Sequence, residues 1–295
     1  MLAVAVVLAA LVSSASSGGA QQKVNLRHAA AADVYVRLTG SIGTLRIVGW
    51  DRDSVVVTGT IPAGMRMDGG AGGDGRTPTR GVKLYFESAS DAVSSAAVLE
   101  LHVPRTGRVW VKSGTANVEA RDVTGGLDIN VIGGSIQVAA SPRELQVEAM
   151  DAAVVIDGSP AWLRAKTAAG DITLRGGSTD LAMTSVSGAL RVEGGSVERA
   201  RLQTVTGAIH FAATPAGAGT LDFDSHSGMI DLLLPPSNGF SLLASSITGE
   251  VVNRFDRTRP TTGREGRGAE LALEAGNASA RITARTFKGT ITVRR

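Results

Sequence analysis

Apolar and polar residues alternate along most of this chain in short runs that glycine separates. The pattern is plainest at Leu181–Val192, where an apolar alternation leads through small hydroxyl residues to Ser-Gly and then to a second alternation. Alternation with a period of two indicates half-buried β-strands. The chain is therefore predicted to be all-β, with many short strands closed by glycine turns.

The glycine of this unit recurs at spacings of 18–21 residues. Apolar pairs follow it by two and four residues, and other apolar pairs precede it by seven and five. Ala152 and Ala269 stand at two further places where the spacing predicts the recurrent glycine. Taking the recurrent position as zero, the glycines are Gly114, Gly134, Gly170, Gly188, Gly207, Gly228, Gly249 and Gly289.

A near-constant period means that each unit is one structural turn. A unit of about 20 residues buries too little apolar surface to fold alone, so it must stack on similar neighbours. We therefore expect a single-stranded parallel β-solenoid (β-helix) with rungs of about 18–21 residues. The crossover rule for parallel strands predicts a right-handed coil.

A second apolar column stands two residues before each glycine. The apolar residues five and two positions before the glycine lie three residues apart, an odd number. One straight strand therefore cannot place both of these columns inside. A corner is expected between them, at the small hydroxyl residues three before the glycine. The minus-two residues are Ile132, Met150, Ala168, Val186, Val205, His226, Ile247 and Phe287.

The first 20 residues have the order of a secretory signal peptide. An apolar run, Leu2–Val12, is followed by serines and glycines, and cleavage is expected after Ala20. The run is shorter than the roughly 20 apolar residues that span a bilayer. Export to the periplasm or the cell surface is the expectation, with no transmembrane segment after cleavage, and a retained N-terminal anchor is the alternative.

The mature chain divides into two parts. Residues 21–108 are expected to form an N-terminal β cap and the first rungs, with a flexible glycine-rich loop at 63–81. Residues 109–295 are expected to form the regular solenoid. Gly43, with the alternating Leu45 and Ile47, marks a first and less regular rung.

Composition removes several classes of function. The chain has no cysteine, which excludes disulfides, thiolate metal sites, a cysteine nucleophile and an acylated cysteine. The net charge of +3 is spread along the chain, and the arginines at 254–267 have no aromatic residues interleaved with them except Phe255 at the edge. Nucleic acid is therefore not expected as a partner.

The repeated unit is similar to that of a known family. The segments TSVSGALRV, QTVTGAIHF and DSHSGMIDL, together with IGTLRIVGWDRDSVVVTG at residues 42–59, resemble the bacterial "putative adhesin" β-strand-repeat family, a DUF4097-like domain of unknown function. The resemblance covers nearly all of the mature chain. It implies an exported all-β repeat fold without established catalytic residues.

The sharpest chemical oddity is His226, which interrupts an apolar column. It is flanked by Asp222, Asp224 and Asp231, so a His-Asp acid/base site or a metal site on that rung can be imagined. The simpler interpretation is a bend histidine bonded to neighbouring hydroxyls or backbone. These four residues are the candidate surface residues, and no catalytic, metal or cofactor-binding residue is assigned.

Two functions are consistent with these patterns. The first is a non-enzymatic binding or scaffold module of the cell envelope, whose partner is an envelope protein or a glycan. The alternative is a polysaccharide-active β-helix lyase or hydrolase, which would gather carboxylates on one face. Asp128, Asp171 and Asp231 fall on outward positions but in different columns, which favours the first.

Overall fold

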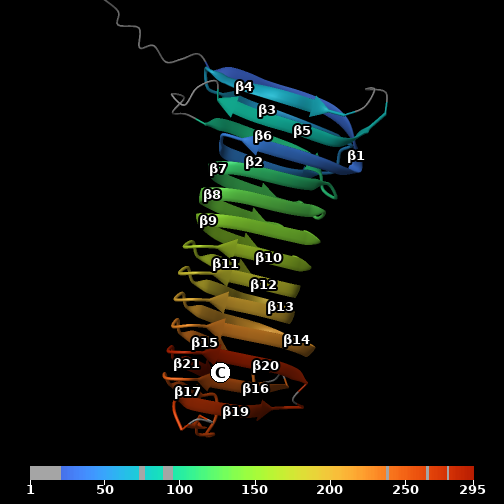
Figure 1. The fold of residues 1–295 in the computed structure, drawn as a ribbon. Helices are drawn as coiled ribbons and strands as arrows, with labels where there is room; N and C mark the ends of the chain where they lie inside the picture. Colours follow the sequence, from blue (N-terminus) through green and yellow to red (C-terminus); the bar gives the residue numbers. More distant parts are fainter. Residues whose placement is uncertain (1–20, 73–76, 89–95, 237–238, 264–265, 278) are drawn as a thin grey trace, which may run out of the picture.

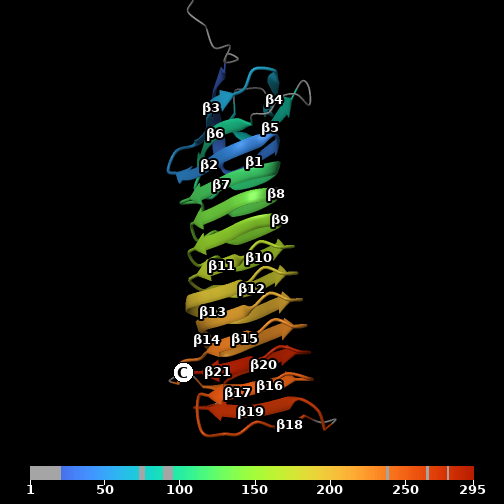
Figure 2. The same cartoon turned by 90° about the vertical axis from the view of Figure 1, so that its left-hand side faces the viewer.

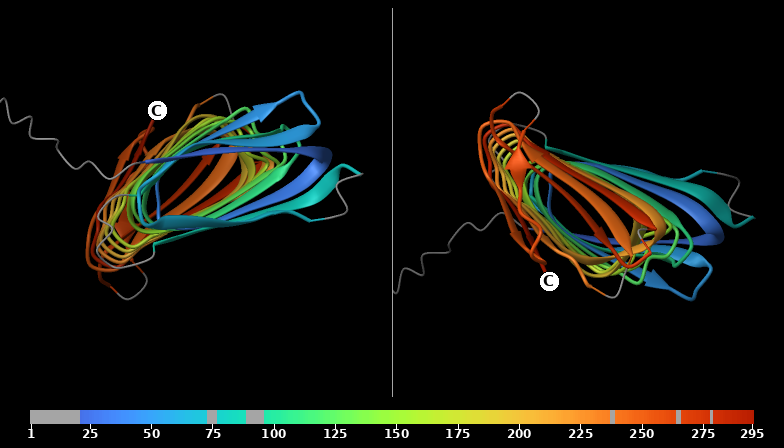
Figure 3. Two further views of the ribbon diagram at one scale, coloured as in Figure 1. Left: turned by 90° about the horizontal axis from the view of Figure 1, so that it is seen from above. Right: turned by 90° about the horizontal axis from the view of Figure 1, so that it is seen from below.

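The computed structural model describes residues 21–72, 77–88, 96–236, 239–263, 266–277 and 279–295, so the expected signal peptide lies outside it. These residues form a rod of stacked β-strands (Figures 1 and 2), and the view along the rod shows one flattened coil (Figure 3). Most strand pairings are parallel, and the antiparallel ones lie at the two ends of the rod. The prediction of an all-β, solenoid-like fold is confirmed.

The strands are β1 (Gln22–Gly40), β2 (Ile42–Trp50), β3 (Ser54–Ile61), β4 (Met65–Ala71), β5 (Thr79–Ser88), β6 (Ala97–Pro104), β7 (Arg108–Arg121), β8 (Gly126–Ala139), β9 (Glu144–Asp157), β10 (Trp162–Thr167), β11 (Ile172–Arg175), β12 (Ser178–Ser185), β13 (Leu190–Thr204), β14 (Ile209–Ser225), β15 (Ile230–Leu233), β16 (Phe240–Ser246), β17 (Val251–Arg254), β18 (Thr261–Thr262), β19 (Ala269–Ala275), β20 (Ala280–Thr286) and β21 (Ile291–Arg294).

The interior of the coil is a set of aliphatic ladders. Parallel pairing in register places like positions of successive rungs directly over one another, about 4.8 Å apart. The ladder two residues after the recurrent glycine is buried throughout. Its members are Leu45, Val118, Ile136, Val154, Ile172, Leu190, Ile209, Ile230, Ile291 and Val251.

The recurrent glycines stack at equivalent corners, as the repeat predicts. A Cβ added to Gly188 would lie 2.1 Å from the carbonyl oxygen of Gly170, and one added to Gly207 would lie 2.0 Å from that of Gly188. Glycine is therefore required by the close approach of one backbone to the next. The same contact continues through Gly228, Gly289 and Gly249.

The predicted corner is built by buried hydroxyl groups three residues before the glycine. Ser185 Oγ accepts a hydrogen bond from the Gly188 amide at 2.9 Å, and Thr167 Oγ1 donates to the Gly170 carbonyl at 2.6 Å. Thr167 and Ser185, on adjacent rungs, are also bonded to each other at 3.0 Å. These bonds satisfy backbone groups at the bend that strand pairing cannot reach.

The minus-two column is exposed, contrary to its apolar character. Ile132, Met150, Val186 and Ile247 are each more than half exposed, and Phe287 is 39 % exposed. The corner does not turn this column inward, because the hydroxyl column beside it already occupies the inner side of the bend. The result is an apolar stripe along one edge of the rod.

Two positions assigned to the glycine column were wrong. Gly114 lies in the minus-two column, opposite Ile132, and the residue that stacks under Gly134 is Ala116. Ala269 begins β19, which pairs antiparallel with β16 and closes the rod instead of adding a parallel rung.

The predicted first rung at Gly43 lies near the other end of the rod. Thr44 pairs with Asn117, so the strand that follows Gly43 stacks in parallel on the regular rungs.

The rungs do not stack in chain order at the C-terminal end. Strand β20 pairs with β14 on one side and β16 on the other, and β21 lies between β15 and β17 in the same way. The last rung of the sequence is thus inserted between two earlier ones, as Figure 1 shows in red between orange layers.

The N-terminal cap contains more strand than expected. Within the segment 63–81, predicted as a flexible loop, Met65–Ala71 forms β4 and pairs antiparallel with β5. Met65 is buried and anchors the strand, while the glycines around it hide the alternation in the sequence. Residues 73–76 of that segment lie outside the described ranges.

Candidate functional site

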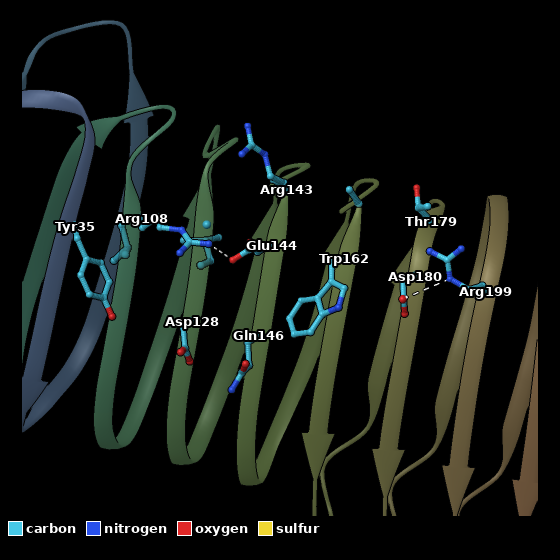
Figure 4. Close-up of a pocket in the computed structure, with 14 residues that line it drawn as sticks. Tyr35, Arg108, Asp128, Arg143, Glu144, Gln146, Trp162, Thr179, Asp180 and Arg199 are labelled. Carbon is cyan, nitrogen blue, oxygen red and sulfur yellow. Dashed lines mark hydrogen bonds and ion pairs between the residues drawn. The ribbon is translucent and has the colours of Figure 1, made fainter.

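A cleft of about 830 Å³ runs along one face of the rod (Figure 4). It crosses β1, β7, β8, β9, β10, β12 and β13, on the side formed by the first strand of each rung. Parallel pairing puts its outward side chains into two neighbouring columns: the main column runs from Tyr35 to Arg199, and Asp128 and Gln146 stand two residues along their strands from it. The lining residues are Tyr35, Arg108, Val109, Gly126, Leu127, Asp128, Arg143, Glu144, Gln146, Ala161, Trp162, Thr179, Asp180 and Arg199.

Gly126 shapes one wall of the cleft. It lies between Arg108 and Glu144 in the column and has no side chain, so the Arg108 side chain crosses it. A Cβ at Gly126 would lie 3.2 Å from Arg108 Nε. Arg108 consequently pairs with Glu144, two strands away, which fixes both side chains at the edge of the cleft.

A second ion-paired group closes the other end. Asp180 pairs with Arg164 (Nη2 to Oδ1, 2.7 Å) and with Arg199 (Nε to Oδ2, 3.5 Å). The Asp180 and Arg164 side chains are about 70 % buried, at 31 % and 28 % exposure. Two of the three carboxylates that line the cleft, those of Glu144 and Asp180, are therefore neutralised by arginine.

Aromatic rings stand on both sides of the centre. The Arg37 guanidinium lies 4.8 Å from the Tyr35 ring centre and 5.7 Å from that of Trp110. The Arg164 guanidinium lies 4.5 Å from the Trp162 ring centre. Cation–π contacts of this kind are attractive and favour these positions of the rings on the surface. Tyr35 and Trp162 both line the cleft.

Asp128 and Gln146 form the centre of the cleft. They are register partners on β8 and β9, both half-buried, and Figure 4 shows them between the rings of Tyr35 and Trp162, which belong to the neighbouring column. Asn130 donates a 2.6 Å hydrogen bond to Asp128 Oδ1. Burial, with a smaller contribution from the charge of Glu148, raises the pKa of Asp128 above its usual value.

A family model described as Toastrack DUF4097 matches residues 39–294. The chain belongs to this family. The resemblance drawn from the repeated unit is thereby confirmed.

Two solved structures are similar to this Toastrack chain. One, from Clostridium sporogenes, is described as a "putative cell adhesion protein"; it is 11 % identical, with 93 % of this chain and 98 % of that chain covered, and the TM-score is 0.23. The other, from Bacteroides fragilis, is described as a "putative adhesin"; it is 10 % identical, with 92 % and 96 % covered, and the TM-score is 0.31. No curated protein matches the chain.

The four candidate surface residues are not brought together in the Toastrack fold. Asp222 and Asp224 point outward from β14, and Asp224 lies 3.9 Å from Arg285. His226 is exposed at the corner and stacks on Phe287 with ring centres 5.2 Å apart. Its backbone amide donates to the Thr204 carbonyl, as expected of a bend residue.

Asp231 lies on the other face of the coil, on β15. Its partner is His210, whose Nδ1 is 2.9 Å from Asp231 Oδ2, and Arg294 completes the group. No described group of three or more His, Asp or Glu residues could hold a metal ion. Nor does any helix within the described ranges have the length and apolarity to cross a membrane.

The cleft was missed by sequence reasoning, and the reason is geometric. Its column runs from Tyr35 to Arg199 through residues of unlike type, so no local motif marks it. One signal was available: Tyr35, Trp110 and Trp162 are outward residues in a chain with only 4 % aromatics.

Proposed function

We propose that this Toastrack chain is an exported, non-enzymatic module of the cell envelope, a right-handed solenoid that binds its partner through the cleft. Export places it in the periplasm or on the cell surface. The partner is an envelope protein or a glycan. The fold contributes a rigid rod, and the cleft contributes fixed rings and polar groups that do not need to be ordered when a partner binds.

The observation that carries this proposal is the pairing state of the cleft carboxylates. General acid/base cleavage of a glycan uses two carboxyl groups that flank the scissile bond. Glu144 and Asp180 are each held by arginine, which leaves Asp128 as the carboxylate at the centre. Such an arrangement supports recognition of a partner rather than bond cleavage.

The test is capture from envelope extracts with the full chain. Gln146→Arg places a long charged side chain in the middle of the cleft, whereas Gln137→Arg makes the same change at an exposed position on the opposite face. We expect a partner that the unchanged chain and Gln137→Arg retain and that Gln146→Arg loses. Equal capture by all three proteins would refute binding through the cleft.

A polysaccharide-active enzyme is the second candidate, and one observation favours it. Asp128 combines a raised pKa with a place in a cleft, which is typical of catalytic acids. The purified chain should then release reducing ends or unsaturated products from a polysaccharide, and Asp128→Asn should abolish the release. We expect no such products from the unchanged chain.

A further inference from the structure

We infer that the cleft binds a glycan, a hydroxyl-rich chain of sugars that lies along the rod and crosses the strands at right angles. This inference rests on the proposed binding function and specifies the chemistry of the ligand. It is carried by two neighbouring outward columns that line the cleft. The rings of Tyr35 and Trp162 stand in one, on β1 and β10, and Asp128 and Gln146 stand in the other, on β8 and β9 between them.

The rings supply apolar surfaces of the size of one sugar. A pyranose has one face of C–H groups and a rim of hydroxyls, so it packs flat on an aromatic ring while its rim stays hydrogen-bonded. Trp162 and Tyr35 are partly exposed, and each has an arginine side chain near its ring. Both rings line the cleft, so their accessible surface faces a ligand that lies in it.

The centre of the cleft matches the rim of a sugar. An ionised Asp128 offers acceptors only, whereas the Gln146 amide offers both donors and an acceptor. Adjacent hydroxyls of a sugar ring donate and accept in the same way, so the two side chains can serve a pair of hydroxyls. Arg164 is the register neighbour of Gln146 but pairs with Asp180, and among the described residues no arginine forms an ion pair or hydrogen bond with Asp128 or Gln146, so both are available to a neutral group.

The length and direction of the cleft fit a polymer. From Tyr35 to Arg199 the column makes six strand steps, about 29 Å at 4.8 Å each. A glycan repeat is close to one strand spacing, so successive sugars meet successive rungs. The ion pairs of Arg108 with Glu144 and of Arg164 with Asp180 stand along the path and keep its walls in place.

Other polymers fit less well. A peptide that adds a strand needs a free sheet edge, and the strands under the cleft are paired on both sides. A helical peptide needs a continuous apolar groove, whereas Asp128 and Gln146 interrupt this one. Single-stranded nucleic acid needs an excess of positive charge beside its rings, and here Glu144 and Asp180 offset the arginines.

The experiment is affinity electrophoresis of the full chain in gels that contain one polymer each. The polymers are a neutral glucan, a neutral galactomannan, an acidic polygalacturonate and, as a separate arm, a proline-rich peptide measured by calorimetry. Trp162→Ala and Gln146→Ala are compared with Gln137→Ala on the opposite face. We expect retardation by at least one polysaccharide, weakened about tenfold by each cleft variant and unchanged by the control.

Trp162→Phe is the control for misfolding of Trp162→Ala, because phenylalanine keeps an aromatic ring and should recover part of the affinity. Retardation by no polysaccharide, or equal retardation of cleft and control variants, overturns the inference, as does binding of the peptide alone. The proposed function fails separately. If Gln146→Arg loses an envelope partner while no polysaccharide binds, the cleft binds a protein; if Gln146→Arg loses nothing, the cleft is not the binding site.

Discussion

Arg294 and Asp231 form a two-point ion pair although they are 63 residues apart: Arg294 Nε lies 2.9 Å from Asp231 Oδ1, and Nη2 lies 2.8 Å from Oδ2. The pair joins the last strand of the chain, β21, to β15. His210 adds a third contact from the rung before. Three rungs are thereby connected at the place where the stacking order departs from the sequence.

Acid should weaken this contact. The hydrogen bond from Arg294, assisted by its charge, holds the pKa of Asp231 below its usual range. A carboxyl group with a lowered folded pKa stabilises the protein above its unfolded pKa, near 3.9, and this contribution disappears as the pH falls through the folded value. Asp231→Asn should cost about 1 kcal/mol at neutral pH, since partial exposure screens the pair.

Urea denaturation of the unchanged chain and of Asp231→Asn, at neutral pH and in the acid range, measures the contribution of this ion pair to stability. The difference in unfolding free energy should shrink below about pH 4. Asp157→Asn is the control, because Asp157 makes a similar contact with Arg175 on the surface, with both side chains more than half exposed. A difference that stays constant in acid would contradict the assignment.

Gly188→Ala should destabilise the rod strongly, and Gly114→Ala should not. A Cβ at Gly188 would meet the Gly170 carbonyl oxygen at 2.1 Å, whereas nothing lies within 4 Å of the corresponding point at Gly114. Moving backbone in a packed coil costs about 3 kcal/mol. Alanine at Gly114 should change the unfolding free energy by less than about 1 kcal/mol, in the stabilising direction. Thermal and urea unfolding distinguish the two.

The repeating rung can be predicted from the sequence, but the register between neighbouring strands can be predicted only in part. Period-two alternation and the near-constant spacing correctly predicted parallel stacking, because each rung repeats the same ladder. Gly114 was assigned to the glycine column in error, because it lies only two residues before Ala116, which holds the equivalent place. Alanine fits in the glycine column at positions 116 and 152. The close backbone contact at these places is made by the glycine of the next rung, Gly134 over Ala116 and Gly170 over Ala152.

The apolar stripe was misjudged for a related reason. Residues such as Met150 and Phe287 are as hydrophobic as core residues, and alternation alone does not reveal on which side of a bend they lie. The hydroxyl column decides it, because Thr167 and Ser185 turn inward to bond the backbone. The cleft was beyond prediction because its residues meet only after the rungs are aligned.

The two methionines Met150 and Met183 provide a direct test of which column is inside. Met183 is fully buried and Met150 is 60 % exposed. Met183→Ala should cost about 2–5 kcal/mol, the range for removing a buried aliphatic side chain. Met150→Ala should change stability by less than about 0.5 kcal/mol. Equal losses in urea unfolding would mean that the corner turns the minus-two column inward after all.

Removal of the leader is the expectation that the sequence alone supports. The unchanged chain, produced in a bacterium with an export pathway, should be recovered from the envelope fraction with Gln21 as its first residue, because small residues precede a signal cleavage site. N-terminal sequencing measures this. Replacing Leu8 by Arg should interrupt the apolar run and keep the chain, with its leader, inside the cell; an unprocessed chain in the membrane fraction would instead indicate a retained anchor.

The inserted rung can be tested by disulfide formation, because the chain has no cysteine of its own. Asp222 on β14 is the register partner of Thr283 on β20, and Thr283 is the register partner of Leu243 on β16. Neighbouring strands lie about 4.8 Å apart, within disulfide range, whereas two strand steps exceed it. The pair Asp222→Cys with Thr283→Cys should therefore oxidise, and Asp222→Cys with Leu243→Cys should not. Stacking in chain order would reverse the two results, so non-reducing gel mobility decides whether the last rung folds between two that precede it.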